Sequence, residues 1–548
     1  MTAQIDRNFS VDSLAGRPSR KTALLISPPI YDTQYWAEWS QPYGLLRIAS
    51  LLEKKRYRKI WFFDFMETDS SRQVRFHRID ARESYADKNL PEGKPGPIVV
   101  ARGQEQLLLQ KRHFGKTWEH FEEWLKRRGL MKNPPEEVWI SSVMSYWWES
   151  TRDLTLRIRR YFGKRTTIIL GGIYPSIAAE HAAAFTVANV VVQGEVAEAN
   201  NLWTEVGVYK QSPSYAIITP SRGCPYDCSY CAQRTINAGV STVRFRPPTD
   251  IVAEMKHKYE NFGIRDFAFY ADFLLIRWKE NLLPVLKQIV QTKLPFRLYA
   301  PEGLDTRFLS QSQELIDWMK AAHFQKLYLP VESIDNTYVR SLNRKHVKLQ
   351  HFVRAAKMCE RAGFQLRNLD VNAFVLYGLP GESIDRVVKT VLFVSELVGS
   401  IIPMLFTPVP STALFREHLP FFKRRGWDRD LHMLNGKLLP FLDTFEGSVA
   451  DYIDLQRLMF TLNAHYRSES FRVFGTSKVA AAFRDNIRNS FDQFIGLYKD
   501  TELGAEPTDI GPYTGTLKAE PQESRSAELV HIADPGASLR PDQFRVEN

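Results

Sequence analysis

The stretch Ser221-Arg222-Gly223-Cys224-Pro225-Tyr226-Asp227-Cys228-Ser229-Tyr230-Cys231 holds three of the four cysteines of this 548-residue chain within eight positions. Cysteine thiolates are the usual protein ligands of iron–sulfur cubes. Three thiolates on one loop can bind three irons of a [4Fe–4S] cluster and leave the fourth iron open to a chelating ligand. The spacing therefore predicts a metal site at Cys224, Cys228 and Cys231, in a reducing compartment.

Two other interpretations of the cysteines stay open at this point. A structural zinc site needs four ligands, and no further Cys or His lies close enough in sequence to complete one. Cys359 could do so only through the fold, because the helical pattern over residues 352–362 predicts a buried thiol there. Chance spacing is the other alternative. A zinc-stabilised binding module without enzymatic activity thus remains a remote hypothesis.

Apolar segments after the cysteine loop alternate between strand and helix patterns. Strands are expected over residues 216–218, 266–270, 297–299, 326–330, 370–376 and 401–406. Six such units, with amphipathic helices between them, predict a partial (β/α)6 barrel over residues 206–414, with its chemistry at the carboxyl ends of the strands. The cysteine loop follows the first of these strands and should lie at that end.

An earlier βα series precedes the barrel. Its strands are expected over residues 23–29, 60–65, 138–143, 167–172 and 190–192, and its helices over residues 44–55, 118–128 and 151–161. The alternation predicts a doubly wound, flavodoxin-like parallel sheet over residues 21–205. Such sheets bind ligands beyond the carboxyl ends of their strands. Apart from the helix at 118–128, residues 67–135 show no regular pattern.

The two ends of the chain carry weaker patterns. Residues 1–20 are polar and are predicted to be loose. Residues 415–500 are predicted to be mostly helical. Residues 501–548 are predicted to be disordered because they are rich in Pro, Gly, Ser, Asp and Glu. The chain has no secretory signal and no transmembrane segment, so a cytoplasmic protein is expected. The net charge of +11 is scattered, which favours a solvated basic surface, and no nucleic-acid partner is expected.

Several segments after the cysteine loop make residues 210–414 resemble the radical S-adenosylmethionine (SAM) superfamily. These are Tyr270-Ala271-Asp272-Phe273, Val331-Glu332-Ser333, Tyr377-Gly378-Leu379-Pro380-Gly381-Glu382 and Pro408-Val409-Pro410-Ser411-Thr412. The resemblance implies that the first segment contacts the SAM amino group, that the second lies near the ribose, and that the third lies near adenine. The cofactor-binding residues implied in this domain are Tyr230, Tyr270, Asp272, Glu332, Ser333, Gly378, Pro380 and Gly381.

The N-terminal domain is similar to the doubly wound domain that commonly binds cobalamin in this superfamily. The resemblance implies cofactor contacts at Ser27, Pro28, Pro29, Ser145, Gly171, Gly172, Pro175, Gly194 and Glu195. The glycine pair has a physical rationale, because backbone without side chains can approach a bulky nucleotide tail. A D-x-H-x-x-G motif is absent, so cobalamin is expected to bind without a histidine on cobalt. A domain that binds nothing and only organises the barrel is the alternative.

An aromatic group in the N-terminal domain fits either a corrin site or a core. Its members are Trp36, Trp39, Tyr146, Trp147 and Trp148.

The resemblance implies an enzyme that uses a [4Fe–4S] cluster to cleave SAM to a 5′-deoxyadenosyl radical and methylcobalamin to methylate the substrate radical. A cobalamin-dependent cyclase or rearrangement enzyme without methyl transfer is the alternative in the same class. A small molecule, a lipid and a peptide all remain candidate substrates. An electron donor such as flavodoxin or ferredoxin is the expected partner.

Overall fold

The structure is a computed structural model of the chain. It describes residues 3–14, 20–33, 35, 39–67, 98–102, 105–109, 111–237, 239, 242–344, 347–367 and 370–444, together with residues 452, 455, 459, 462 and 463. The predicted tail over residues 501–548, and most of the predicted helical region beyond residue 444, lie outside the described residues. Within the described part of the chain, no helix has the length and apolar character needed to cross a membrane.

The N-terminal domain is built on a six-stranded parallel sheet with the order β1-β10-β9-β8-β2-β4. Its strands are β1 (Gln4–Asp6), β2 (Thr22–Ser27), β4 (Lys59–Asp64), β8 (Glu137–Ser141), β9 (Thr167–Gly171) and β10 (Val190–Val192). Its helices are α1 (Tyr43–Lys54), α2 (Trp118–Arg127), α3 (Trp148–Phe162), α4 (Ile173–Ile177) and α5 (Ala179–Phe185). The predicted doubly wound α/β fold is confirmed, with the expected strands and helices in place.

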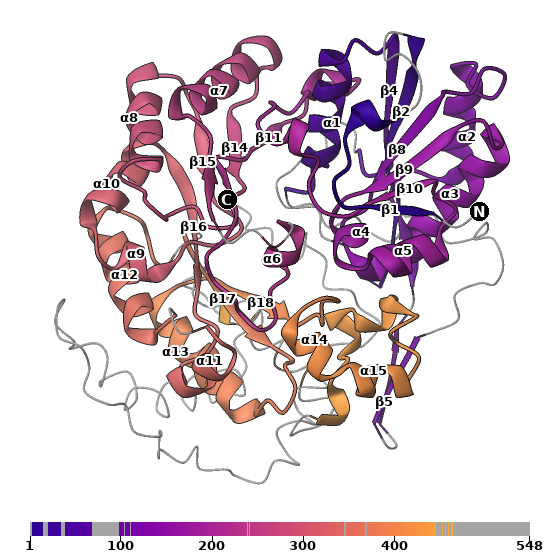
Figure 1. The fold of residues 1–548 in the computed structure, drawn as a ribbon. Coiled ribbons are helices and arrows are strands. Elements are labelled where there is room, and N and C mark those ends of the chain that lie inside the picture. Colours follow the sequence, from indigo (N-terminus) through magenta and orange to yellow (C-terminus); the bar gives the residue numbers. More distant parts are fainter. Residues whose placement is uncertain are drawn as a thin grey trace, which may run out of the picture.

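Both faces of this sheet are buried, which explains why its strands are apolar at nearly every position. In β2, Leu24 and Ile26 belong to one core cluster with side chains of α2, α3 and α5. Ala23 and Leu25 belong to a second cluster with α1. Successive side chains of a strand point to opposite faces, so these helices cover the sheet from both sides (Figure 1).

Two parts of the N-terminal domain differ from the sequence-based expectation. Within the segment predicted to be loose, β1 pairs with β10, and Phe9 and Val11 are buried. Within the segment expected to be irregular, β5 (Ile98–Arg102) pairs with β6 (Glu105–Leu109), and β7 (Arg112–Phe114) pairs with β3 (Ile30–Asp32). β1, β3 and β7 have only three residues each and pair with partners distant in sequence, so periodicity did not reveal them. β5 and β6 form a local hairpin of two five-residue strands, which the sequence analysis overlooked.

The second domain is an open six-stranded parallel barrel with the order β11-β14-β15-β16-β17-β18. Its strands are β11 (Tyr215–Ile218), β14 (Asp266–Phe269), β15 (Arg297–Tyr299), β16 (Phe324–Pro330), β17 (Val371–Tyr377) and β18 (Ile401–Leu405). Its helices are α6 (Gln233–Ile236), α7 (Pro248–Phe262), α8 (Leu282–Thr292), α9 (Thr306–Leu309), α10 (Gln313–Ala321), α11 (Asn336–Ser341), α12 (Leu349–Arg361) and α13 (Ile384–Leu397). The predicted partial (β/α)6 barrel is confirmed.

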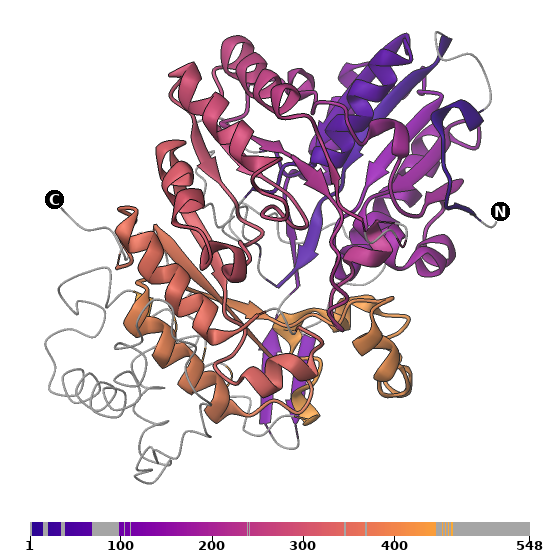
Figure 2. The same cartoon turned by 60° about the vertical axis from the view of Figure 1, so that its left-hand side comes forward.

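The two domains lie side by side, with α6 between them (Figures 1 and 2). Trp39 of the N-terminal domain packs with the barrel residues Ile217, Ala268 and Tyr299 and is almost fully buried. Its ring lies 4.6 Å from that of Tyr299, centroid to centroid. Trp39 therefore joins the core between the domains. The neighbouring Trp36 of the same aromatic group lies outside the described residues.

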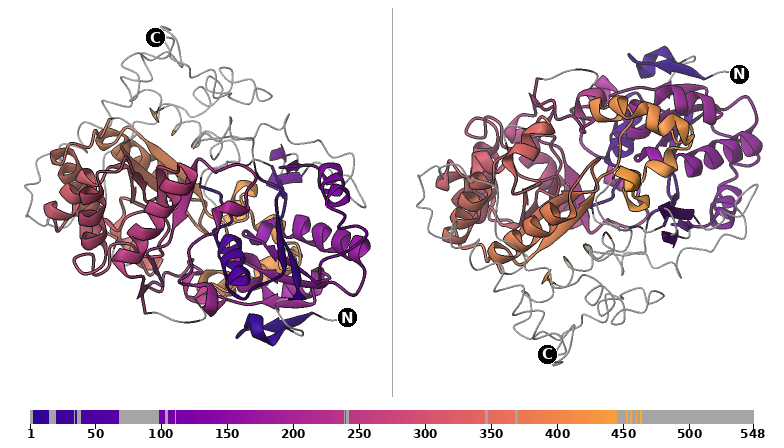
Figure 3. Two further views of the ribbon diagram at one scale, coloured as in Figure 1. Left: turned by 90° about the horizontal axis from the view of Figure 1, so that it is seen from above. Right: turned by 90° about the horizontal axis from the view of Figure 1, so that it is seen from below.

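The segment after the barrel returns to the N-terminal domain (Figure 3). It contains α14 (Ala413–Glu417), α15 (Leu419–Arg424) and a 3₁₀ turn at Leu431–Leu434. Trp148 Nε1 donates a hydrogen bond to Asp430 Oδ1 over 3.3 Å, and His432 Nδ1 lies 3.0 Å from the Tyr146 carbonyl oxygen. This segment thereby holds the turn over residues 145–148, which follows β8.

A buried carboxylate anchors the same contact from the N-terminal domain. Asp32, at the end of β3, is fully buried and accepts hydrogen bonds from Trp147 Nε1 at 2.9 Å, Asn435 Nδ2 at 3.0 Å and Lys437 Nζ at 2.9 Å. Burial alone would raise the pKa of this carboxyl group, but Lys437 and Trp147 hold the pKa below its ordinary value. Asp32 is therefore an ionised side chain that links two segments about 400 residues apart in sequence.

Removing the Asp32 carboxylate takes this acceptor from Trp147, Asn435 and Lys437. An Asp32→Ala variant is expected to lose about 3 kcal/mol of unfolding free energy, because a buried ion pair is broken on one side only. Asp443→Ala is the matched control, because its ion pair with Arg425 is exposed and should contribute less than about 1 kcal/mol. Urea denaturation measures both, and equal losses in the two variants would contradict the prediction.

Candidate functional site

The cysteine loop begins directly after the first barrel strand. A two-residue strand, β12 (Ser221–Arg222), pairs with β13 (Arg244–Phe245) and leads into the loop. Gly223 has φ +104°, and a Cβ at this position would lie 2.5 Å from the Thr242 carbonyl oxygen. Only glycine fits this turn without strain. The backbone thus places Cys224, Cys228 and Cys231 at the carboxyl end of the barrel, where the sequence predicted them.

The three cysteines are unpaired thiols on one loop, and Cys228 is buried. Among the described residues, no three Cys, His, Asp or Glu side chains converge as ligands of one metal ion. A mononuclear zinc site would need such convergence, whereas in a [4Fe–4S] cube each thiolate binds a different iron. Burial raises the pKa of the Cys224 and Cys228 thiols. The donor set therefore fits a cube better than a single ion.

Cys359 does not belong to this site. It lies in α12, is fully buried, and the pKa of its thiol is raised to about 12 by burial alone. The prediction of a buried structural cysteine is confirmed.

Arg344, in the segment after α11, contacts the cysteine loop. Its Nη1 donates to Cys228 Sγ over 3.8 Å, and its Nη2 pairs with Glu332 Oε1 at 2.8 Å. Glu332 itself has φ +62°, a conformation that is costly for a residue with a side chain. Arg344 was missed by sequence analysis, since it stands in a loop without a motif and is brought to Cys228 only by the fold.

Tyr230 lies inside the cysteine loop beside Arg344. Its hydroxyl group is buried and has no hydrogen-bond partner within the described residues. Its ring lies 5.8 Å from the Arg344 guanidinium carbon. An orphaned hydroxyl beside the loop fits a site that takes a polar ligand, because buried polar groups are otherwise paired.

The other residues expected to bind SAM follow successive barrel strands. Tyr270 and Asp272 come after β14, and Ser333 comes after β16 along with Glu332. Asp272 accepts a hydrogen bond from the backbone N–H of Gly223 at 2.6 Å. Tyr270 donates its hydroxyl hydrogen to the Trp39 carbonyl at 3.0 Å. These side chains are therefore grouped at the same end of the barrel as the cysteines.

The third SAM segment follows β17. The Gly378 N–H donates to the carboxylate of Glu382, which is buried and has its pKa raised to about 7 by burial. The N–H of Gly381 donates to Thr444 Oγ1 over 3.2 Å, with Pro380 next to it. This turn is thus stabilised from within and by the segment after the barrel.

The N-terminal residues expected to contact cobalamin also share one end of their sheet. Ser27, Pro28 and Pro29 lie at the end of β2, Ser145 follows β8, Gly171, Gly172 and Pro175 lie at the end of β9 and beyond, and Gly194 and Glu195 follow β10. Because all strands of this sheet are parallel, these loops meet at its carboxyl edge. The structure brings the whole predicted set to one edge.

Glycine is required at position 172 for a different physical reason from the one inferred from the sequence. It has φ +104°, and a Cβ there would lie 2.3 Å from the Ser142 carbonyl oxygen. The close approach is thus between the loops after β9 and β8. Gly171 has no such constraint, since a Cβ added there would lie no closer than 3.9 Å to its nearest neighbour, Val192 Cβ.

Glu195 points toward the barrel and forms ion pairs with it. Its carboxylate lies 3.1 Å from Arg222 Nε and 2.6 Å from Arg244 Nη2. A residue expected to contact cobalamin is therefore already bonded to the strand that leads into the cysteine loop. Arg222 was missed by sequence analysis, although its place two positions before Cys224 was a usable signal.

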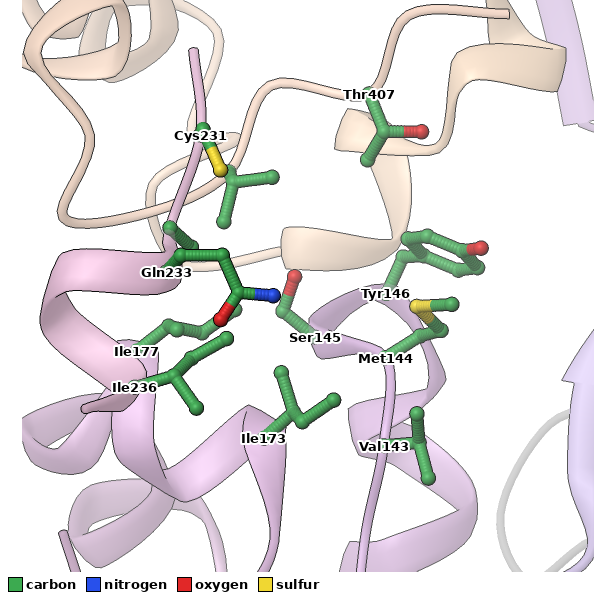
Figure 4. Close-up of a pocket in the computed structure, with 12 residues that line it drawn as sticks. Val143, Met144, Ser145, Tyr146, Ile173, Ile177, Cys231, Gln233, Ile236 and Thr407 are labelled. Atoms are coloured by element: carbon green, nitrogen blue, oxygen red, sulfur yellow. The ribbon is translucent and has the colours of Figure 1, made fainter. Parts of the chain in front are cut away.

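A pocket of about 190 Å³ lies between the carboxyl ends of the two domains (Figure 4). The N-terminal domain contributes residues 143–146 after β8 and Ile173 and Ile177 of α4. The barrel contributes residues of the cysteine loop and α6, including Cys231 and Gln233.

Two residues after β18, Thr407 and Val409, complete the lining, and no lining residue carries a charge. The polar groups that line the pocket include the Ser145 hydroxyl and the Gln233 amide, which approach it from different domains (Figure 4). Most of the lining side chains are apolar, and Cys231 at the edge of the pocket is exposed.

Comparisons with known proteins agree with this geometry. Residues 218–394 match the model of the radical SAM superfamily. A tRNA-2-methylthio-N(6)-dimethylallyladenosine synthase of Sulfurihydrogenibium sp. (strain YO3AOP1) is 21% identical over 227 residues, which cover 40% of this chain and 49% of that protein. The chain thus spans about half the length of that relative.

Two further similarities extend beyond the barrel. A bacteriochlorophyllide d C-12(1)-methyltransferase of Chlorobaculum tepidum is 21% identical over 300 residues, 48% of this chain and 62% of that protein. The cobalamin-dependent S-adenosylmethionine radical enzyme OxsB, solved with aqua-cobalamin and S-adenosylmethionine bound, has a TM-score of 0.50 and 10% identity. That match covers 87% of this chain and 76% of OxsB, and it is a likeness of fold. The family match lies within the barrel and covers less than half of the chain, so the comparison shows that residues 218–394 are similar to the radical SAM superfamily.

Proposed function

We propose that this chain is a cobalamin-dependent radical SAM C-methyltransferase. The observation that carries the proposal is the uncharged pocket between the domains, with Cys231 and Gln233 on the barrel side and Ser145 on the other side. Both sheets present the carboxyl ends of their strands to this region, where α/β sheets bind their ligands. The name of the bacteriochlorophyllide methyltransferase and the cobalamin in OxsB support the same reaction class.

The chain's own residues would hold the cofactors in place. Cys224, Cys228 and Cys231 would bind three irons of the cluster, and Asp272 and Glu332 would lie beside SAM. When bound, the cluster and SAM supply a hydrogen-abstracting radical, and cobalamin supplies the methyl group. The apolar walls of the pocket would keep water away from the radical.

A cobalamin-dependent cyclase or rearrangement enzyme is the second candidate, since OxsB shares the fold. Product mass separates the two, because methyl transfer adds one CH₂ unit and rearrangement adds none. A small external electron donor, such as flavodoxin or ferredoxin, is the partner that the proposal requires, since each cleavage of SAM consumes one electron.

The proposal is tested by reconstituting the full chain with iron, sulfide and hydroxocobalamin without oxygen. After gel filtration, the expected protein carries a cluster and about one corrin per chain, seen in its ultraviolet–visible spectrum. Incubation with SAM, reductant and candidate acceptors is then expected to give 5′-deoxyadenosine and methylated product in comparable amounts. If the protein carries a cluster but no corrin, cobalamin-dependent methylation is ruled out. If methylation occurs without formation of 5′-deoxyadenosine, the radical mechanism is ruled out.

A further inference from the structure

Arg222 joins three structural elements at the boundary between the domains. Its Nε donates to Glu195 Oε1 at 3.1 Å, in the loop after β10 of the N-terminal domain. Its Nη1 donates to the hydroxyl oxygen of Tyr43 at 3.1 Å, at the start of α1. The same Nη1 lies 3.9 Å from Asp272 Oδ1, after β14 of the barrel. One guanidinium group therefore contacts both domains.

Two partners of Arg222, Asp272 and Glu195, are hydrogen-bonded to loops of the barrel and of the N-terminal domain, respectively. Asp272 Oδ2 accepts the backbone N–H of Gly223 at 2.6 Å and Asn237 Nδ2 at 3.0 Å, so it holds both ends of the cysteine loop. Glu195 Oε2 accepts Asn200 Nδ2 at 3.0 Å, which holds the loop after β10. A shift of either loop must therefore move the guanidinium group or break one of its bonds.

Arg222 and its acidic partners are largely shielded from solvent, which strengthens their electrostatic interaction. Its side chain is 18% exposed, and those of Glu195 and Asp272 are 10% and 2% exposed. Charge pairs in such partly buried positions are screened less than surface pairs. A planar guanidinium can contact several acceptors in fixed directions, which a lysine ammonium cannot do.

We propose that Arg222 is a positioning residue that couples the two cofactor-binding halves, so that ligand binding at the barrel end orders the loop after β10. The coupling runs from Asp272 through Arg222 to Glu195. By linkage, if SAM changes the affinity for a ligand on the Glu195 side, that ligand must change the affinity for SAM by the same factor. The assignment of cobalamin to the Glu195 side rests on the proposed function, whereas the coupling itself needs only the barrel ligand.

Hydrogen–deuterium exchange of the full chain with its reconstituted cluster tests the coupling, with SAM as the probe. In the wild-type protein, SAM is expected to slow exchange over residues 194–200 by about fivefold or more, the usual size of such coupling. Arg222→Gln is expected to reduce this protection while the iron content stays unchanged, and the pair of Glu195 with Arg244 at 2.6 Å remains in this variant. Arg297→Gln is the matched control, because the Arg297 pair with Asp266 joins two barrel strands at their opposite, amino-terminal end.

Glu195→Gln removes the partner of Arg222 in the N-terminal domain. This second variant tests the inference even if Arg222→Gln fails to fold. It should abolish the protection, because it removes the ion pairs with both Arg222 and Arg244, and combining it with Arg222→Gln should add nothing further. SAM protection of residues 194–200 that is undiminished in Arg222→Gln, persists in Glu195→Gln, or is absent in the wild type would overturn the inference. Failure of the wild-type protein to bind hydroxocobalamin would instead count against the proposed function, because the exchange experiment contains no cobalamin.

Discussion

A Cys228→Ala variant is expected to lose the iron–sulfur absorption at about 400 nm and to cleave SAM only at background level. Cys228 is the buried cysteine of the loop, and Arg344 Nη1 lies 3.8 Å from its sulfur. Two remaining thiolates cannot hold a cube that leaves one iron open to SAM. Iron analysis, the absorption spectrum and the yield of 5′-deoxyadenosine measure the loss after anaerobic reconstitution.

Cys359→Ala is the matched control for this variant. Cys359 is fully buried in α12, so its replacement removes a thiol from the core and leaves the loop intact. This control should retain full iron content and SAM cleavage. A cluster that survives in Cys228→Ala, or disappears in Cys359→Ala, would show that the cluster ligands are wrongly assigned.

A Gly172→Ala variant is expected to lose roughly 3 kcal/mol of unfolding free energy. The new Cβ would meet the Ser142 carbonyl oxygen at 2.3 Å, and the φ of +104° is unfavourable for alanine. The loops after β8 and β9 would have to separate, and they line the carboxyl edge of the N-terminal sheet. Urea denaturation followed by tryptophan fluorescence measures the change, since Trp139 lies on β8.

Gly171→Ala is the adjacent control. Its added Cβ would make only ordinary contact with Val192 Cβ at 3.9 Å, so a change below about 1 kcal/mol is expected. If both variants were equally stable, the close approach at Gly172 would be wrong. If Gly171→Ala impaired hydroxocobalamin retention without a loss of stability, it would support a cofactor role for that glycine.

The two sheets were predictable because each depends on local patterns. Parallel strands buried on both faces read as apolar runs, as in residues 23–27, and the helices between them have a distinct periodicity. The weaker edges were not predictable. β1 and β7 were missed because three residues such as Gln4–Asp6 carry no pattern of their own, whereas β5 and β6 form a local hairpin that the sequence analysis overlooked.

The candidate site shows the same division. The cysteine loop was readable because its three cysteines lie within eight residues. The contact of Arg344 with Cys228 spans 116 positions and that of Lys437 with Asp32 spans 405. No local sequence pattern predicts contacts between residues so far apart in sequence, because a guanidinium or ammonium group can pair with any anionic partner that the fold brings within reach.

The sequence by itself determined the two parallel βα domains and the place of the cysteine loop, since periodicity and spacing are properties of neighbouring residues. The tertiary structure alone decided how the domains face each other. It placed Trp39 in the core between them, bonded Glu195 to Arg222, and made Gly172 a point of contact between two loops. These features depend on which surfaces meet when apolar area is buried, and that is settled only when the whole chain has folded.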